Sequence, residues 1–285
     1  MSTPQELVAC IEKLASLPAV YHRIRDLLDD PDSSVLELAE AVSGDAAITA
    51  RVLRVVNSVL YGFPGKVETV SRAVNLMGMQ QIHDLVLSTL VVAAFNGIRP
   101  ARMHMGRFWS DSVFRGLVAR AAARRLGMGD PERMFVEGLL ADIGHLVMFQ
   151  VAPEPSAAAL ESAARDKEPI QDAEARIVGC NFAEVGAALA SAWRLPGGFA
   201  KAIGAQLMPA LAGPHVNEAA LLHLANQVLA TREHDTPDEA ALALLDPLSV
   251  AMLELEPAQI ADIRAEAEEG LGAVVALFFP AQGGN

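Results

Sequence analysis

The sequence predicts an all-α protein built as a two-lobed helical bundle. Hydrophobic residues make up 52% of the 285 residues and aromatic residues only 5%, and the apolar residues recur at intervals of three and four. Alternation with the period of a strand does not persist for more than a few residues anywhere in the chain. Glycine and proline separate one apolar helical stretch from the next, so we expect helices packed on helices.

The first lobe is expected to cover residues 1–95. Thr3 stands where it can cap a helix that has Pro4 in its first turn. Asp45 can cap another helix after the break at Gly44. The helices of this lobe are expected at 3–17, 18–30, 33–43, 46–62, 69–78 and 79–95.

A link rich in glycine, proline and charge is expected at 96–106, before a second lobe at 107–245. In that lobe a long helix should end at Gly127 and the next should begin at Pro131. Five aromatic residues are expected in its core: Phe108, Trp109, Phe114, Phe135 and Phe149. Residues 246–285 should form closing helices that pack on the second lobe, or a dimerisation element.

Charge and cysteine content limit the class of partner and the compartment. The net charge of −13 argues against a broad nucleic-acid or anionic-membrane surface. A basic cluster at Arg115, Arg120, Arg124 and Arg125 is interpreted as a solvated helix face. Two distant cysteines, the lack of a signal-peptide pattern and the absence of a long apolar run predict a cytoplasmic protein that does not span a membrane.

Two literal His-Asp dipeptides are candidate metal ligands, and neither is favoured. His83-Asp84 lies within a helical stretch where neighbours project about 100° apart, so we interpret it as a solvent-facing polar pair. His234-Asp235 lies in a polar turn, where Asp235 or Thr236 can cap the next helix.

The stretch "GLLADIGHL" at 138–146 is the third candidate. Together with "FWSDSVFRGLVARAAARRLG" before it, it resembles the HD superfamily of metal phosphohydrolases. That resemblance implies a Mn²⁺ or Fe²⁺ site in which the metal activates a water. Transferred residue by residue, the first ligand histidine falls at Asp111, the His-Asp pair at Ala141-Asp142, and the later paired histidines near Ala205-Gln206.

Only Asp142 survives this transfer cleanly, with Asp111 as a carboxylate substitute. One or two carboxylates without an imidazole make a poor site for a transition metal, so we expect no bound metal and no cofactor. His145 lies one helical turn after Ala141 and is the one candidate for a rescuing ligand of a displaced metal. The alternative is a structural role in which Asp142 hydrogen-bonds its neighbours.

Several ordered pieces of the chain resemble the HDOD family (HD-related output domain) over roughly residues 14–230. They include "LP.V", "LLDDPD", "LAE.VS.D..ITARVLR..NS..YG" and "V.T...AV.LMG...I..LVLS" in the first lobe, and "GLLADIG.LVM" and "CNFAEVGAALASAW.LP" in the second. The resemblance implies an all-helical signalling module with an HD-like second lobe, in a family generally regarded as lacking phosphodiesterase activity.

Polar side chains gather at the end of the stretch 46–62. They terminate the helix in one interpretation, and in the other they form a surface for a partner or a nucleotide-like ligand. Ion pairs of Asp45 and Arg51 across the two lobes are a further alternative. The candidate residues are Asp45, Arg51, Arg54, Asn57, Ser58 and Tyr61.

The leading functional hypothesis is a non-enzymatic signal-transduction or regulatory module with a degenerate active site. It would bind a protein partner of a bacterial-type signalling pathway, or sense a small ligand. A homodimer is a further possibility. The alternatives are a metal-dependent cyclic-dinucleotide phosphodiesterase with a rearranged site, and a nucleotide-binding sensor without catalysis.

Overall fold

The computed structural model describes residues 1–12, 15–58, 60–95 and 97–279. Helices account for 73% of the chain, and no strand occurs in the described residues, which confirms the all-α prediction. Residue 96, where the predicted link begins, and residues 280–285 of the predicted closing segment lie outside the described ranges.

The chain divides into two compact units, each formed from separate stretches of sequence. The large unit contains Met1–Ser16 and Gly97–Glu268, and the small unit contains Leu17–Asn96 and Glu269–Asn285. This division differs from the predicted lobes at both ends of the chain. The first helix belongs with the predicted second lobe, and residues 269–279 belong with the predicted first lobe.

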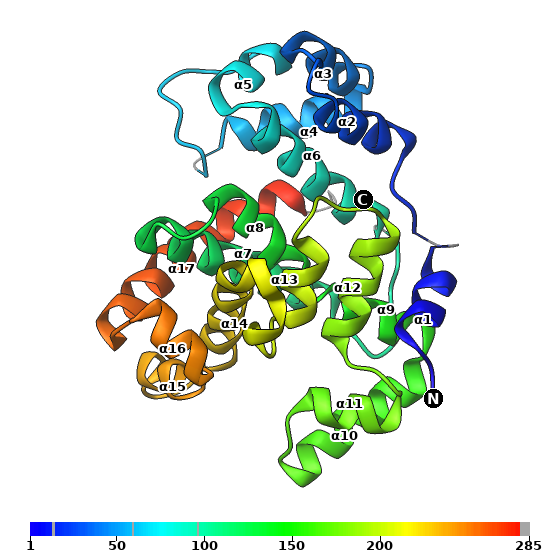
Figure 1. The fold of residues 1–285 in the computed structure, drawn as a ribbon, viewed down its shortest axis with the longest axis vertical. Coiled ribbons are helices and arrows are strands. Elements are labelled where there is room, and N and C mark those ends of the chain that lie inside the picture. The colour runs from blue at the N-terminus through cyan, green and yellow to red at the C-terminus, as the bar shows by residue number, and fades with distance from the viewer. Residues whose placement is uncertain (13–14, 59, 96, 280–285) are drawn as a thin grey trace, which may run out of the picture. The chain divides into compact units, whose positions relative to one another are not determined.

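The small unit contains five complete helices (Figure 1). Asp45 caps α4 as predicted, because its Oδ1 accepts hydrogen bonds from the backbone N–H groups of Ala47 at 2.8 Å and Ile48 at 3.0 Å. A capping box of Ser34 and Glu37 begins the preceding helix. The helices are α2 (Ala19–Asp29), α3 (Val35–Ser43), α4 (Ala46–Val56), α5 (Val70–Met77) and α6 (Met79–Ala94).

His83 and Asp84 correct one prediction, because both side chains are buried in α6 rather than facing solvent. Their exposed fractions are 0% and 1%. Helix α6 packs against α2, α4 and α5, which leaves almost no side open. His83 Nδ1 lies 2.9 Å from Asp84 Oδ1, and Gln80 Nε2 donates to the same oxygen at 3.0 Å. The pair is a buried polar contact of the small unit.

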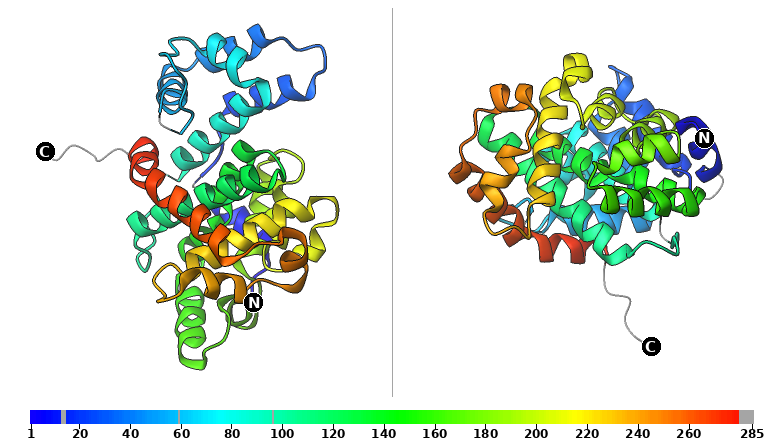
Figure 2. Two further views of the ribbon diagram at one scale, coloured as in Figure 1. Left: turned by 90° about the vertical axis from the view of Figure 1, so that its left-hand side faces the viewer. Right: turned by 90° about the horizontal axis from the view of Figure 1, so that it is seen from below.

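The large unit is a bundle in which α7, α8 and α14 lie against one another (Figures 1 and 2). Thr3 forms a capping box with Glu6, and Gly127 ends α7 in the left-handed conformation, both as predicted in position. Its helices are α1 (Pro4–Ile11), α7 (Met105–Leu126), α8 (Pro131–Leu140), α9 (Ile143–Val151), α10 (Pro153–Asp166), α11 (Ile170–Ile177), α12 (Phe182–Ala192), α13 (Phe199–Ala205), η1 (Pro209–His215), α14 (Val216–Ala230), α15 (Pro237–Ala243), α16 (Pro247–Leu253) and most of α17 (Pro257–Phe278).

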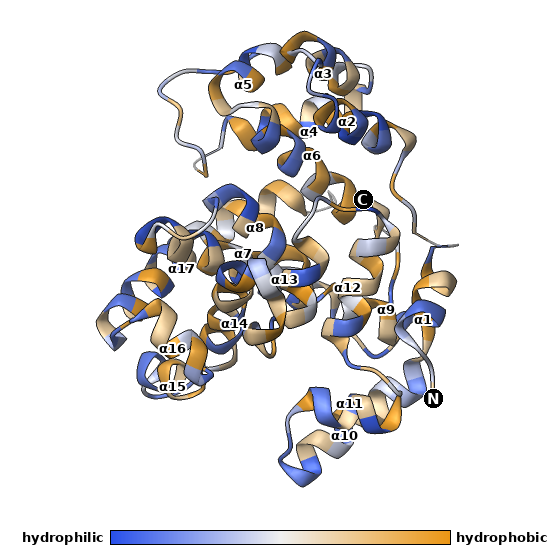
Figure 3. Cartoon of the chain, viewed as in Figure 1, coloured by the Kyte–Doolittle hydropathy of each residue, from blue (hydrophilic) through white to orange (hydrophobic). Residues whose placement is uncertain are grey.

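The core of the large unit contains the five aromatic residues predicted for it. All five are buried: Phe108, Trp109, Phe114, Phe135 and Phe149. Most helices carry hydrophilic residues beside hydrophobic ones, so each can bury one side and expose another (Figure 3).

One stretch, Pro131–Val151, is long and apolar enough by composition to cross a membrane. Within the protein 78% of its apolar window is buried, as in the core helix of a globular unit, and the chain turns at Ala141-Asp142 between α8 and α9. This stretch is therefore weak support for a membrane span.

The arginine cluster of α7 is only partly the solvated face that was predicted, because Arg124 and Arg125 are exposed and the other two arginines are not. Arg115 is only 6% exposed. Arg120 pairs with Glu132 of α8 at 2.7 Å. The other two arginines, Arg124 and Arg125, pair with Glu266 and Asp262 of α17. These cations serve contacts between helices of the large unit.

Candidate functional site

Two glycine crossings bring four helices together around Asp142. At the first, α7 meets α8, because a Cβ atom added to Gly138 would lie 2.7 Å from the Cα atom of Gly116. Only glycines permit that approach. Arg115, beside Gly116, is thereby placed against the turn that follows α8.

At the second crossing α9 meets α12. A Cβ atom on Gly144 would lie 1.9 Å from the carbonyl oxygen of Phe182 and 2.9 Å from the amide nitrogen of Gly186. Gly186 lets the backbone of α12 come this close to α9. This approach places the imidazole of His145 on the ring of Phe182, with the centroids 4.3 Å apart and the planes 18° apart.

Arg115, Asp142, His145 and Glu174 form an alternating set of charges, called here the ion cluster. The two oxygens of Asp142 take different cations: Oδ1 lies 2.5 Å from His145 Nδ1, and Oδ2 lies 3.6 Å from Arg115 Nη2. The other imidazole nitrogen, Nε2, lies 2.8 Å from Glu174 Oε1. Asp142 and Glu174 therefore hold the imidazole between two carboxylates.

The ion cluster is largely shielded from water. Glu174 is 2% exposed, and the side chains of Asp142 and His145 keep 18% and 17% of their surface. The second oxygen of Glu174 accepts a hydrogen bond from the backbone N–H of Phe182 at 3.0 Å. Nε and Nη1 of Arg115 are buried without a hydrogen-bond partner in the described residues, so Asp142 supplies its counter-charge.

The charges of the ion cluster fix its protonation state. Burial alone would raise the pKa of Asp142, but the charges of His145 and Arg115 outweigh it and hold that pKa below its usual range. Burial alone would lower the pKa of His145, but the charge and hydrogen bonds of Asp142 and Glu174 raise it to about 10. The imidazole is therefore protonated at neutral pH and donates from both nitrogens.

This arrangement predicts that the free energy of unfolding falls as the pH rises above about 6.5, the pKa of histidine in an unfolded chain. The pKa of His145 is about 10 in the folded protein. Its stabilisation is complete below the unfolded value and is lost toward the folded value, on the order of 1 kcal/mol per pH unit. Urea unfolding at several pH values up to about 9 measures the slope.

The variant His145→Gln is the control for this slope, because it cannot lose the proton in question. The range ends near pH 9 because burial raises the pKa of Cys180 to about 11, which adds its own loss of stability at higher pH. A slope that is the same in His145→Gln would show that the ion cluster does not cause it.

Three of the transferred metal positions do meet in the structure. Gln206 is fully buried, and its Nε2 donates to the carbonyl oxygen of Ala141 at 2.8 Å, while Ala205 is buried beside it. Gln206 Oε1 accepts from Asn226 Nδ2 at 2.9 Å. His223 Nδ1 lies 2.9 Å from the carbonyl oxygen of Gln206. The one polar side chain at these positions, that of Gln206, is thus used by the backbone of Ala141 and by Asn226.

Asp111 is not brought into the ion cluster by any interaction of the described residues. It lies one helical turn before Arg115 on α7 and pairs with Arg107 at 3.5 Å, with 27% of its side chain exposed. Among the residues that the structure describes, no group of three or more His, Cys, Asp or Glu side chains is arranged to hold a metal ion.

In the small unit, Asn57 closes the loop after α4. Its Nδ2 donates to the carbonyl oxygens of Leu53 and Val67, both at 2.7 Å, and its Oδ1 accepts from the N–H of Val67 at 2.7 Å. The Ser58 hydroxyl donates to a backbone carbonyl of α4 at 2.6 Å. Helix termination, the first of the two interpretations of these residues, is thus what their hydrogen bonds do.

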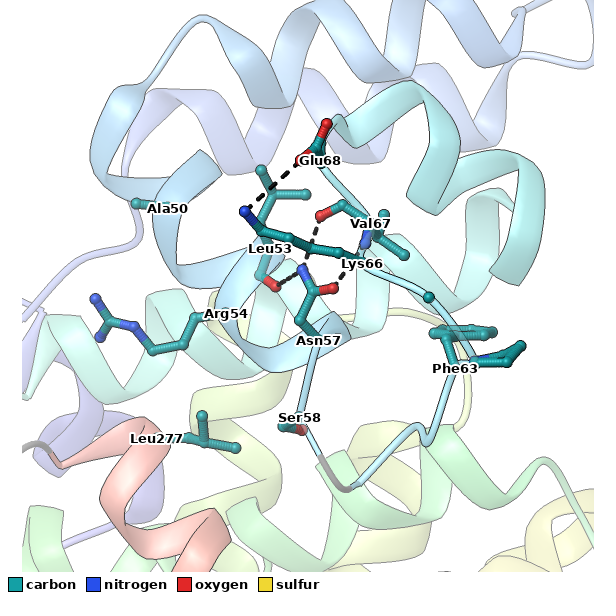
Figure 4. Close-up of a pocket in the computed structure, with 12 residues that line it drawn as sticks. Ala50, Leu53, Arg54, Asn57, Ser58, Phe63, Lys66, Val67, Glu68 and Leu277 are labelled. Atoms are coloured by element: carbon teal, nitrogen blue, oxygen red, sulfur yellow. Dashed lines mark hydrogen bonds and ion pairs between the residues drawn. The ribbon is translucent and has the colours of Figure 1, made fainter.

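The other candidates of this surface have different environments. Arg51 and Arg54 are exposed and form no hydrogen bond or ion pair within the described ranges. Tyr61 stacks on Phe63, with the ring centroids 6.2 Å apart. Arg54, Asn57 and Ser58 line a pocket of about 960 Å³ (Figure 4).

The sequence pattern of the HDOD domain matches residues 14–209. The chain belongs to the HDOD family. A protein of Treponema pallidum (strain Nichols) with no assigned function is 25% identical over 190 residues, which are 65% of this chain and 36% of that protein. The matched part of the HDOD chain therefore spans about a third of that relative.

Solved structures share the HDOD fold. A presumed phosphohydrolase of Shewanella amazonensis SB2B is 26% identical with a TM-score of 0.73, covering 95% of this chain and 96% of that one. An HDOD domain protein of unknown function from Geobacter sulfurreducens is 23% identical with a TM-score of 0.66, covering 93% and 97%. A presumed signal transduction protein of Marinobacter aquaeolei VT8 is 23% identical with a TM-score of 0.70, covering 98% and 61%.

Sequence reasoning missed two members of the ion cluster, Arg115 and Glu174. Arg115 had a usable signal, because it shares a helix face with Val118, Ala119 and Ala122, all buried. Glu174 had none, since its partner His145 lies on another helix.

Proposed function

We propose that this HDOD protein is a non-enzymatic regulatory module of signal transduction in the cytoplasm. The observation that supports the proposal is the ion cluster. It places two protein cations on Asp142, the one residue that the HD pattern leaves in place. A module of this kind acts by binding a protein partner or a small ligand.

The donor set does not fit a divalent metal. Asp111 stands apart, Ala141 and Ala205 offer no ligand atom, and the amide of Gln206 is used by backbone and by another side chain. Both oxygens of Asp142 face cations. A metal would have to displace a guanidinium that has no other counter-charge among the described residues.

The rival phosphodiesterase with a rearranged site needs His145 as a neutral ligand. Metals bind the unprotonated imidazole nitrogen, and the two carboxylates around His145 favour the protonated ring. The same contacts thus oppose the rescue role considered for this residue.

The charge of the chain supports a basic protein surface as the partner. The chain has a net charge of −13, so a basic partner would associate with it faster. Such complementary charge selects the partner more than it sets the affinity. A partner from a bacterial-type signalling pathway and a homodimer are both compatible with this proposal.

Metal content and hydrolysis test the proposal together. The full chain, purified without chelator or affinity metal, should show background metal in elemental mass spectrometry, before and after incubation with Mn²⁺ or Fe²⁺. It should also fail to hydrolyse bis(p-nitrophenyl) phosphate and cyclic di-GMP with either metal. About one or two metals per chain, lost in Asp142→Asn and retained in Asp111→Asn, would refute the proposal.

A further inference from the structure

The pocket of the small unit has the size and preformed walls of a ligand site. Its volume of about 960 Å³ lies within the range of small-molecule pockets, roughly 300–1,000 Å³. Figure 4 shows side chains of α4, the loop at 63–68 and Leu277 of α17 around it, all from the small unit. Asn57 fixes the loop to α4 through three hydrogen bonds of 2.7 Å, so the wall exists before any ligand arrives.

Asn57 and Ser58 form hydrogen bonds that shape the wall of the pocket. The charge of the lining comes from other side chains. Arg54 is exposed and forms no ion pair or hydrogen bond in the described part of the chain. Lys66 lies 3.6 Å from Glu68, and both are largely exposed at 78% and 73%. An exposed pair of this kind contributes little and yields to a stronger anion.

The local charge is opposite to that of the chain as a whole. Two cations, Arg54 and Lys66, and one carboxylate, Glu68, line the pocket, in a protein with a net charge of −13. Arg54 also stands in the last turn of α4, where a positive charge complements the helix dipole. The dipole accounts for a cation at that position but not for the second cation or for the apolar residues of the lining.

The apolar part of the lining gives the ligand its second feature. Leu53, Phe63 and Leu277 line the pocket together with the charged residues. The Phe63 ring lies parallel to that of Tyr61, with 4° between the ring planes and 6.2 Å between the centroids, and it adds an aromatic surface to the lining.

We propose that this pocket binds a small organic anion. A phosphate or carboxylate group would pair with Arg54 and Lys66, because a guanidinium matches the two oxygens of either group. An apolar or aromatic body would lie on the remaining wall. This inference rests on the proposed regulatory function and gives it a ligand class.

The test uses four probes that separate the contribution of the anionic group from that of the aromatic ring. They are phenyl phosphate, benzoate, phenol and inorganic phosphate. Ligand-observed NMR on the full chain should show binding of phenyl phosphate or benzoate, with phenol about tenfold weaker or more, the effect of one charged hydrogen bond. Comparing the two aromatic anions shows whether phosphate or carboxylate is preferred, and inorganic phosphate should compete in the first case.

Matched variants locate the binding. Arg54→Ala should weaken the anion about tenfold, whereas Arg23→Ala, an exposed arginine of α2 outside the pocket, should leave it unchanged. Equal effects of the two variants, equal binding of phenol, or no binding of any anion would overturn the inference. Binding of a polyglutamate peptide alone, lost in Arg54→Ala, would also overturn it and make the pocket a protein-docking site.

These outcomes are separate from the fate of the proposed function. Stoichiometric metal with hydrolysis would refute the regulatory role. The comparison of Arg54→Ala with Arg23→Ala would still show whether an anion binds in the pocket. If no anion binds and no metal is found, the inference about the pocket fails, and the proposed function stands as a module that binds proteins.

Discussion

Replacement of Gly144 by alanine is expected to lower the free energy of unfolding by more than about 3 kcal/mol, at the upper end of overpacking effects. The added Cβ atom would lie 1.9 Å from the carbonyl oxygen of Phe182. That oxygen belongs to backbone at the start of α12, so it cannot turn away as a side chain could. The contact can be relieved only by moving α12 relative to α9. Urea unfolding followed by circular dichroism measures the loss.

Gly272→Ala is the matched control, because Gly272 is also helical and has no atom within 4 Å of an added Cβ. Alanine there should stabilise the protein by up to about 1 kcal/mol, since it is the better helix former. The two substitutions are chemically identical and should have opposite signs. A loss below about 1 kcal/mol for Gly144→Ala would mean that α9 and α12 lie further apart in solution.

The glycine result also bears on the site. If α9 and α12 move apart, His145 leaves the ring of Phe182, and Glu174 loses its hydrogen bond to the same residue. The pH dependence assigned to His145 should therefore weaken in Gly144→Ala if enough folded protein remains for measurement.

Much of the fold was accessible from the sequence because its signals are local. The caps Thr3 and Asp45, the helix end at Gly127 and the buried aromatic residues depend on a few neighbouring positions. The division into units was less accessible. It depends on where the first helix and the end of α17 pack, and periodicity does not state which partner a helix face meets.

His83-Asp84 shows how a local reading fails. The angle between neighbouring side chains on a helix favoured a solvent-facing polar pair at this position. The stretch from Ile82 to Val92 is buried at every position, as a nearly continuous apolar run predicts for a helix covered on all sides. The two polar residues are tolerated there because they contact each other.

Part of the candidate site could be predicted from the sequence. Asp142 and the adjacency of the Ala141 and Gln206 positions followed from the HD pattern, and the structure brings those two together. The cations on Asp142 did not follow from it. Arg115 was hidden in a run of four arginines, three of which reach carboxylates of other helices.

Removal of the Asp142 carboxylate is expected to cost about 3–5 kcal/mol, the effect of leaving a buried charge without its partner. In Asp142→Ala, Arg115 would remain 6% exposed with two nitrogens that already lack partners in the described residues. Asp111→Ala is the matched control, because Asp111 lies on the same face of α7 as Arg115. Among the described residues its carboxylate pairs only with Arg107, which is 71% exposed, so the loss should stay within about 1 kcal/mol.

A second substitution separates charge from shape. Arg115→Met removes the stranded cation and keeps an apolar side chain of similar length, so Asp142→Ala with Arg115→Met should be more stable than Asp142→Ala alone. His145 would keep Glu174 in the double variant. If the double variant instead loses the sum of the two single losses, the pair is not energetically coupled. Asp142 would then be held by His145, and Arg115 would not oppose a metal at this carboxylate.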